Sequence, residues 1–271
     1  RSCSTLSQQE TRNKTMPQVL LNEYCPPIYT IKHVDLKFDL DEEATQVTSI
    51  LKITKQIADS NEDLILNGGN FQLESIELNS RKLSELEYTI ANGDLTLHHT
   101  PDEPFTLKIV TKLNPKENKE LEGLYATDSI LTTQCESQGF RNITYYLDRP
   151  DVLATFTTEI HADITKFPVL LSNGNLRDSS VNEASNKHCL VYHDPNPKPS
   201  YLFALVAGDL MLLKDQFITK SNKRVALNIY VPKNGIDKVD HAMHGLKLAM
   251  KFDEDEYDRE YDLELYNIVG V

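Results

Sequence analysis

The sequence predicts a mostly β protein in two parts: an antiparallel β-sandwich domain, then an incomplete α/β unit. Apolar and polar residues alternate with a period of two over much of the first two hundred residues, as in half-buried strands. An Asn-Gly pair indicates a tight hairpin, and the apolar period becomes helical near the C-terminal end. We place a flexible tail at 1–24, the β-domain at 25–210 and the α/β unit at 211–271.

The strands of the β-domain are expected in order along the chain. Val34, Leu36 and Phe38 are separated by charged residues, which is the pattern of a strand with one face in the core. Asn92-Gly93 suits a type I′ turn, because both positions of that turn need a positive φ. We expect strands at 34–40, 47–53, 88–90, 95–97, 105–113 and 156–164.

The α/β unit is expected to contain a strand, a helix and a second strand. The first strand covers 225–231 and ends at Pro232. Apolar residues then recur at helical spacing: Val239, Ala242, Met243, Leu246, Ala249 and Met250. Asp237 is a suitable N-cap. The acidic run at 253–262 ends the helix and leads into the last strand, at 263–271.

Composition narrows the functional classes. A formal net charge of −13 argues against nucleic acid as a partner, because phosphates require clustered Lys and Arg. No apolar run approaches the roughly 20 residues that cross a bilayer, and the first residues lack the apolar segment of a secretory signal. The four cysteines show no paired spacing. We therefore expect no membrane partner, no disulfide framework and a reducing cytoplasmic location.

One segment carries a specific signature. Residues 133–158 read TQCESQGFRNITYYLDRPDVLATFTT, and related stretches follow at 173–175 (NGN), 197–209 (PKPSYLFALVAGD) and 260–263 (EYDL). In order and spacing this pattern closely resembles bacterial aminopeptidase N, a family of zinc-dependent alanyl aminopeptidases of the gluzincin class. The resemblance covers most of the chain from about residue 29.

The resemblance implies a β-saddle domain followed by the start of a thermolysin-like catalytic domain. It also implies that the family's Gly-Ala-Met-Glu-Asn segment and zinc motif would come after Val271. On this basis the parent protein is a zinc metalloaminopeptidase that releases N-terminal residues from peptides. The chain itself is expected to hold no catalytic residue and no cofactor, to be inactive alone, and to pack against the missing catalytic domain.

Two residues of the signature are implied in substrate binding. In the family, the Glu that corresponds to Glu136 reaches into the catalytic cleft and binds the α-ammonium group of the substrate. Gln134 is expected beside the pocket for the first side chain of the substrate. The resemblance also raises the expectation of a cis peptide bond between Glu136 and Ser137. The charged residues that follow are expected to form ion pairs that hold loops on the scaffold: Arg141, Asp148, Arg149 and Asp151.

Other chemistry is less well supported. A His-Glu-x-x-His motif is absent, since none of the eight histidines precedes a Glu. His241 and His244 are three residues apart on the expected helix, and Cys189 and His193 share one face of a strand. The sequence offers no third metal ligand for either pair. The acidic run 253–256 lacks the spacing of a calcium loop. Cys135 is expected to be a buried thiol with no nucleophilic role.

The alternative class is a stand-alone, non-catalytic β-domain that acts as a binding or interaction module. Its support is the absence of catalytic machinery from this sequence. The coding sequence beyond Val271 discriminates between the two readings.

Overall fold

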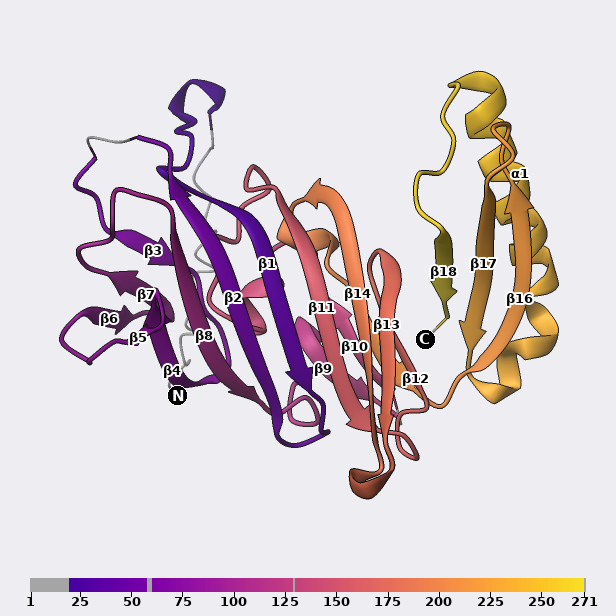
Figure 1. Ribbon diagram of the computed structural model, residues 1–271, viewed down its shortest axis with the longest axis horizontal. Coiled ribbons are helices and arrows are strands. Elements are labelled where there is room, and N and C mark those ends of the chain that lie inside the picture. Colours follow the sequence, from indigo (N-terminus) through magenta and orange to yellow (C-terminus); the bar gives the residue numbers. More distant parts are fainter. Residues whose placement is uncertain (1–19, 58–59, 129, 271) are drawn as a thin grey trace, which may run out of the picture.

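The computed structural model describes residues 20–57, 60–128 and 130–270 (Figure 1), so most of the expected tail lies outside the described residues. The strands are β1 (Tyr29–Asp39), β2 (Thr45–Lys55), β3 (Leu64–Leu66), β4 (Gln72–Leu78), β5 (Arg81–Lys82), β6 (Tyr88–Ala91), β7 (Asp94–Leu97), β8 (Phe105–Leu113), β9 (Gly123–Thr127), β10 (Ile130–Gln134), β11 (Ala154–Asp163), β12 (Val169–Ser172), β13 (Asn175–Asn182), β14 (Lys187–Lys198), β15 (Leu205–Gly208), β16 (Met211–Ile218), β17 (Arg224–Val231) and β18 (Leu265–Val269). The α-helix is α1 (Asp240–Glu256), and 3₁₀ turns cover Leu21–Glu23, Phe140–Asn142, Glu183–Ser185, Ser200–Leu202 and Lys233–Lys238.

An eight-stranded sheet forms the main layer, in the order β13-β14-β11-β1-β2-β8-β4-β5. Its neighbouring strands are antiparallel except β1 and β11, which run parallel. The period-two prediction is confirmed in β1, where Val34, Leu36 and Phe38 are buried while the residues between them are at least partly exposed. In β11 the strand ends at Asp163, one residue before the predicted limit.

The predicted hairpin is confirmed between β6 and β7. Ala91 pairs with Asp94, so the loop consists of Asn92 and Gly93 alone. Their φ angles are 54° and 90°, which are the positive values that the primed turn requires. This hairpin and β3 make a small three-stranded sheet.

A second layer closes the β-domain. The sheet β12-β15-β10-β9 packs its buried residues, such as Leu131 and Leu205, into the same core as the eight-stranded sheet. Four aromatic rings lie near the centre of this core, with neighbouring centroids 5.4–6.1 Å apart: Phe38, Phe140, Phe156 and Phe203. The predicted mostly antiparallel, mostly β architecture is therefore confirmed.

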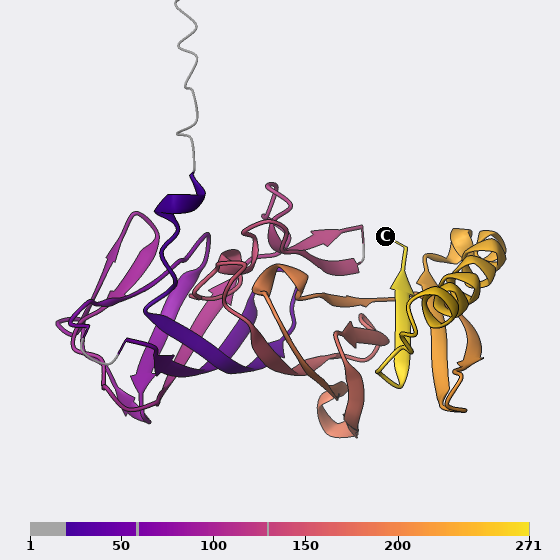
Figure 2. The same cartoon turned by 90° about the horizontal axis from the view of Figure 1, so that it is seen from above.

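The last sixty residues form a separate small layer with its own core. The sheet β16-β17-β18 buries Val225, Leu227 and Ile229 against α1. Seen from above, β18 lies on the side that faces the β-domain and α1 on the side away from it (Figure 2). The side chain of Asn175, on β13, accepts a hydrogen bond from the backbone of Glu264 at 2.8 Å, which links the two layers.

For this layer one strand was missed, one prediction is wrong and another is wrong in part. Strand β16 was not predicted, because its solvent-facing side chains leave no clean alternation. Asp237 is not the N-cap of the helix, since it lies inside a 3₁₀ turn and Val239 takes the capping position without a side-chain hydrogen bond. The helix therefore starts at Asp240. Met243 and Met250 of the predicted apolar stripe are buried, together with Glu254, whereas Ala242 and Ala249 are exposed, so that part of the prediction is wrong.

The sequence predicted no membrane-spanning segment and no disulfide framework. Among the described residues, no helix is both long enough and apolar enough to span a membrane. Cys135 and Cys189 are free thiols, whereas Cys3 lies outside the described residues.

Candidate functional site

The two residues expected to bind substrate lie at the end of the β9–β10 hairpin. Gln134 is the last residue of β10 and pairs with Gly123 at the start of β9. Glu136 follows in the turn that leaves the strand, and the side chains of both residues are exposed. The Gln134 amide donates a long hydrogen bond of 3.5 Å to the backbone carbonyl of Glu136. The side-chain amide of Gln134 therefore contacts the backbone of Glu136.

The turn that carries Glu136 is closely packed. The Glu136–Ser137 peptide bond is cis, as the resemblance suggested. The Gly139 amide donates to the Cys135 carbonyl at 2.8 Å, which closes the turn. A Cβ atom on Gly139 would lie 2.5 Å from the Gln134 carbonyl oxygen, so only glycine fits here without a shift of the backbone.

The side chain of Cys135 is buried in the core at the start of the turn. Its side chain is 2% exposed, and burial, with a smaller contribution from the charge of Asp148, raises the pKa of its thiol far above the usual value. A thiol that stays protonated is a poor nucleophile. The prediction of a buried thiol at this position is confirmed.

The other end of the turn enters the aromatic core. Phe140 is fully buried, and its ring meets those of Tyr146 and Phe203 edge to face, with centroids 4.8 and 5.4 Å apart. Such ring pairs contribute about 0.5–1.5 kcal/mol beyond the area that they bury. The exposed Glu136 is thus held between two buried residues, Cys135 and Phe140.

An ion pair fixes the segment that follows. The Arg141 Nε donates to Asp148 Oδ2 at 3.1 Å, and the Ser200 hydroxyl donates to the other oxygen, Oδ1, at 2.6 Å. Asp148 is buried, at 3% exposure, so both of its oxygens need such partners. Asp148 therefore ties the loop after Glu136 to the 3₁₀ turn at Ser200–Leu202.

A second ion pair lies nearer the surface. Arg149 donates to both oxygens of Asp151, at 2.9 and 2.7 Å, and also to the Cys25 carbonyl at 2.9 Å. The hydrogen bond from Arg149 lowers the pKa of Asp151 below its ordinary value. The expected structural role of the four charged residues in the signature is therefore confirmed.

Glu136 takes no part in these ion pairs. Within the described part of the chain its carboxylate has no hydrogen bond and no ion pair, although Arg141 and Arg149 follow it in the same signature. An exposed carboxylate on a fixed turn can accept charge-assisted hydrogen bonds from a cation. The geometry is suited to binding an ammonium group.

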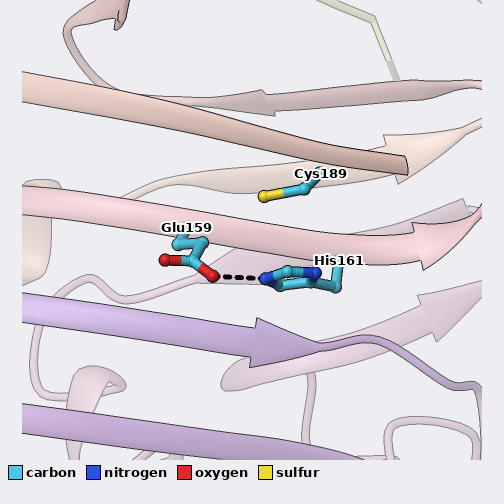
Figure 3. Close-up of side chains that lie close together, drawn as sticks. All are labelled: Glu159, His161 and Cys189. Carbon is cyan, nitrogen blue, oxygen red and sulfur yellow. Dashed lines mark hydrogen bonds and ion pairs between the residues drawn. The ribbon is translucent and has the colours of Figure 1, made fainter. Parts of the chain in front are cut away.

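The structure also brings together a side-chain cluster that sequence reasoning missed. Glu159 and His161 on β11 and Cys189 on β14 have ligand atoms within 4.8 Å of one another (Figure 3). Cys189 was considered with His193, four residues along its own strand, but its partner across the ladder is His161. A search for ligands across neighbouring strands could have found this cluster.

The other candidate ligands remain apart. His241 and His244 are both exposed on α1 and, among the described residues, belong to no metal-like cluster. In the acidic run, Glu254 is buried and accepts a backbone hydrogen bond from Lys220 at 3.2 Å, while Asp255 pairs with Lys251 at 2.8 Å.

The chain belongs to the M1 peptidase family: residues 26–202 match the family model for the Peptidase M1 N-terminal domain. It is 46% identical over 249 residues to Aminopeptidase N of Haemophilus influenzae, and 46% identical over 250 residues to that of Escherichia coli. Each of these alignments covers 92% of this chain and 28% of the relative. The chain thus spans less than a third of the length of the curated relatives it matches.

Solved structures agree with this placement. A crystal structure of Legionella pneumophila aminopeptidase A, in complex with aspartic acid, matches with a TM-score of 0.87 at 37% identity, covering 93% of this chain and 30% of that one. An M1 zinc metallopeptidase of Deinococcus radiodurans matches with a TM-score of 0.70 at 14% identity, which supports the fold alone.

Proposed function

We propose that this chain is the N-terminal part of a zinc aminopeptidase that releases N-terminal amino acids from peptides, and that Glu136 binds the α-ammonium group of the substrate. One observation carries the assignment of Glu136. Its carboxylate is exposed and has no partner among the described residues, while the charged residues that follow it in the signature are paired with one another.

The chemistry of an exopeptidase explains the need for such a group. A free N-terminus is a cation at a fixed distance from the first peptide bond, so a carboxylate held in a fixed place can select it. Cys135 below and Phe140 beyond hold the turn of Glu136, so little backbone freedom of the turn is lost on binding. Recognition of the N-terminus is the role we assign to this part of the protein.

Gln134 has a supporting part in this proposal. Its side chain is exposed and adjacent to Glu136, and an amide offers both a donor and an acceptor to a peptide. We assign it to the pocket for the first side chain of the substrate.

The zinc of the proposed parent enzyme does not fit the residues of this chain. No histidine in the sequence is followed by Glu, so the chain has no His-Glu-x-x-His motif to hold a catalytic zinc. We assign no catalytic residue to the chain and expect it to be inactive by itself. The zinc chemistry and the general base belong to the partner domain of the complete enzyme.

The partner domain is expected to pack against β18. In its sheet β18 is the edge strand, and one side of its backbone is free of ladder hydrogen bonds among the described residues. Next to it, a groove of about 580 Å³ is lined by residues of both layers, including Asn173, Leu202 and Tyr266.

We place the complete enzyme in the cytoplasm.

The sharpest test against a stand-alone binding module is the coding sequence beyond Val271. The proposal requires it to continue into Gly-Ala-Met-Glu-Asn and His-Glu-x-x-His segments. A stop codon directly after Val271 would remove the enzyme reading and leave the binding module. The complete protein should release the N-terminal residue from unblocked peptides, whereas the 271-residue chain should not.

A further inference from the structure

The cluster of Glu159, His161 and Cys189 (Figure 3) lies outside the site described above, on the less buried face of β11. His161 stands directly opposite Cys189 in the antiparallel pair of β11 and β14. Glu159 is two residues earlier on β11 and therefore shares the same face. The ligand atoms of all three lie within 4.8 Å of one another.

The backbone under this cluster is well fixed. β11 is paired on both sides, to β1 and to β14, so the Cα positions of Glu159 and His161 are set by two ladders. The cluster is also half-buried, with side-chain exposures of 24% for His161 and 39% for Glu159. Only side-chain torsions need to change for the three groups to converge on one ion.

The donor set has a definite preference. A carboxylate oxygen, an imidazole nitrogen and a thiolate sulfur are the three ligand types of protein-bound Zn²⁺, which is usually four-coordinate. Thiolate disfavours hard cations such as Mg²⁺ and Ca²⁺. Three protein ligands would leave the fourth position to water on the open face of the sheet.

We propose that Glu159, His161 and Cys189 form a binding site for Zn²⁺ or a similar borderline-soft divalent ion. This departs from the expectation, drawn from the sequence, that the chain holds no metal site, and it does not depend on the proposed function. The ion would lie between the three side chains. It would replace the hydrogen bond that now joins Glu159 Oε1 to His161 Nε2 with two metal–ligand bonds.

The ion pair that competes for Glu159 is weak, whereas the thiol proton of Cys189 opposes metal binding. Lys37 Nζ is 3.7 Å from Glu159 Oε1, with both side chains about 40% exposed, and such surface pairs contribute little. Burial and the nearby charge of Glu159 raise the pKa of the Cys189 thiol, so the metal must displace a proton from the sulfur.

Cobalt substitution tests the proposal. The purified chain is treated with chelator, dialysed and titrated with Co²⁺, because a thiolate ligand gives a charge-transfer band that histidine and carboxylate ligands do not. We expect this band to saturate at one equivalent and to be displaced by Zn²⁺. In a longer protein the band also separates this site from a His-Glu-x-x-His centre, which has no thiolate.

Matched variants locate the site. Cys189→Ser should abolish the band, and His161→Asn and Glu159→Gln should each weaken Zn²⁺ binding by more than the about 10 to 100-fold that loss of an outer-shell partner costs. His193→Asn, on the same face of the same sheet, and Cys25→Ser should leave binding unchanged. Circular dichroism should show the same fold in every variant.

Three results would overturn the proposal. The first is Co²⁺ binding without a thiolate band. The second is a band that persists in Cys189→Ser, which would assign it to another cysteine. The third is Zn²⁺ affinity that falls as much in His193→Asn as in His161→Asn, which would mean adventitious binding to a histidine-bearing surface.

Discussion

Gly139 is the residue on which the position of Glu136 depends most directly. It lies three residues after Glu136, donates the hydrogen bond that closes the turn, and packs against the backbone of Gln134 and Cys135. Its φ is not positive, so the requirement for glycine comes from close approach and not from a left-handed backbone.

The substitution Gly139→Ala should therefore destabilise the protein. Its new methyl group would lie 2.5 Å from the Gln134 carbonyl oxygen, and overpacking of this kind costs about 1–3 kcal/mol. The free energy of unfolding in urea measures the effect. Gly245→Ala is the matched control, because nothing lies within 4 Å of a Cβ at that helical position. It should instead stabilise the protein by about 0.5–1 kcal/mol. Equal effects of the two substitutions would contradict this account of the turn.

At the scale of elements, Asp148 joins segments that are far apart in the sequence. Its carboxylate accepts from Arg141 after the β10 turn and from Ser200 before β15. Because the carboxylate is buried, its loss leaves an arginine and a hydroxyl without their acceptor. The loop that carries Glu136 is thereby connected to the sheet on which it rests.

Asp148→Ala is expected to lower the free energy of unfolding by about 3–5 kcal/mol, as when one partner of a buried ion pair is removed. Asp151→Ala removes the bidentate pair with Arg149, whose two side chains are 25–39% exposed. It should cost only about 0–1 kcal/mol. Chemical denaturation of both variants gives the comparison. If Asp151→Ala proved the more costly of the two, burial would not be what gives Asp148 its importance.

The local pattern of apolar and polar residues predicted most of the strands and the helix, but not which strands pair with one another. The alternation in β1 and the Asn-Gly turn between β6 and β7 depend on neighbours in sequence, and both are found as expected. β16 was not predicted because an exposed edge strand has little apolar alternation. The contact of His161 with Cys189 depends on the register of two strands, which no single-strand pattern contains.

The candidate substrate site was placed by resemblance. Spacing alone predicts that Gln134 and Glu136 face one side if the segment is extended, whereas Glu136 lies in the turn after β10. Spacing does not show that Cys135 and Phe140 are buried on either side of Glu136, or that Asp148 finds Ser200 across fifty residues. These long-range contacts fix the turn that carries the exposed carboxylate.

At the scale of the whole molecule, the β-domain and the small α/β layer each have a main core, and a smaller apolar cluster of Leu171, Val206 and Leu210 packs against Tyr230 and Val269 between them. The aromatic core of the β-domain shares no buried residue with the core under α1. Few hydrogen bonds cross between the layers, for example those from Asn196 to Asp262 and from Glu264 to Asn175. A substitution in the core under α1, away from that smaller cluster, should therefore act mainly on the α/β layer.

Met243→Ala tests this expectation. Met243 is 5% exposed under α1, and truncation of a buried methionine costs about 2–5 kcal/mol. Hydrogen exchange should become faster in β17 and α1 and stay unchanged in β1 and β11. Leu248→Ala, on the same helix but 55% exposed, should change neither layer. Faster exchange throughout the β-domain in Met243→Ala would show one cooperative unit.

The central claim is that Glu136 recognises the substrate N-terminus, and kinetics of Glu136→Ala in the complete enzyme test it most directly. A charge-assisted hydrogen bond contributes about 1.5–3 kcal/mol. We therefore predict that kcat/KM for an unblocked peptide falls roughly 10 to 150-fold, while the zinc content of the catalytic centre is unchanged. The same peptide with an acetylated N-terminus, measured as a competitive inhibitor, should bind wild type and variant alike. An equal loss for both peptides would mean that Glu136 supports the fold and does not bind the N-terminus.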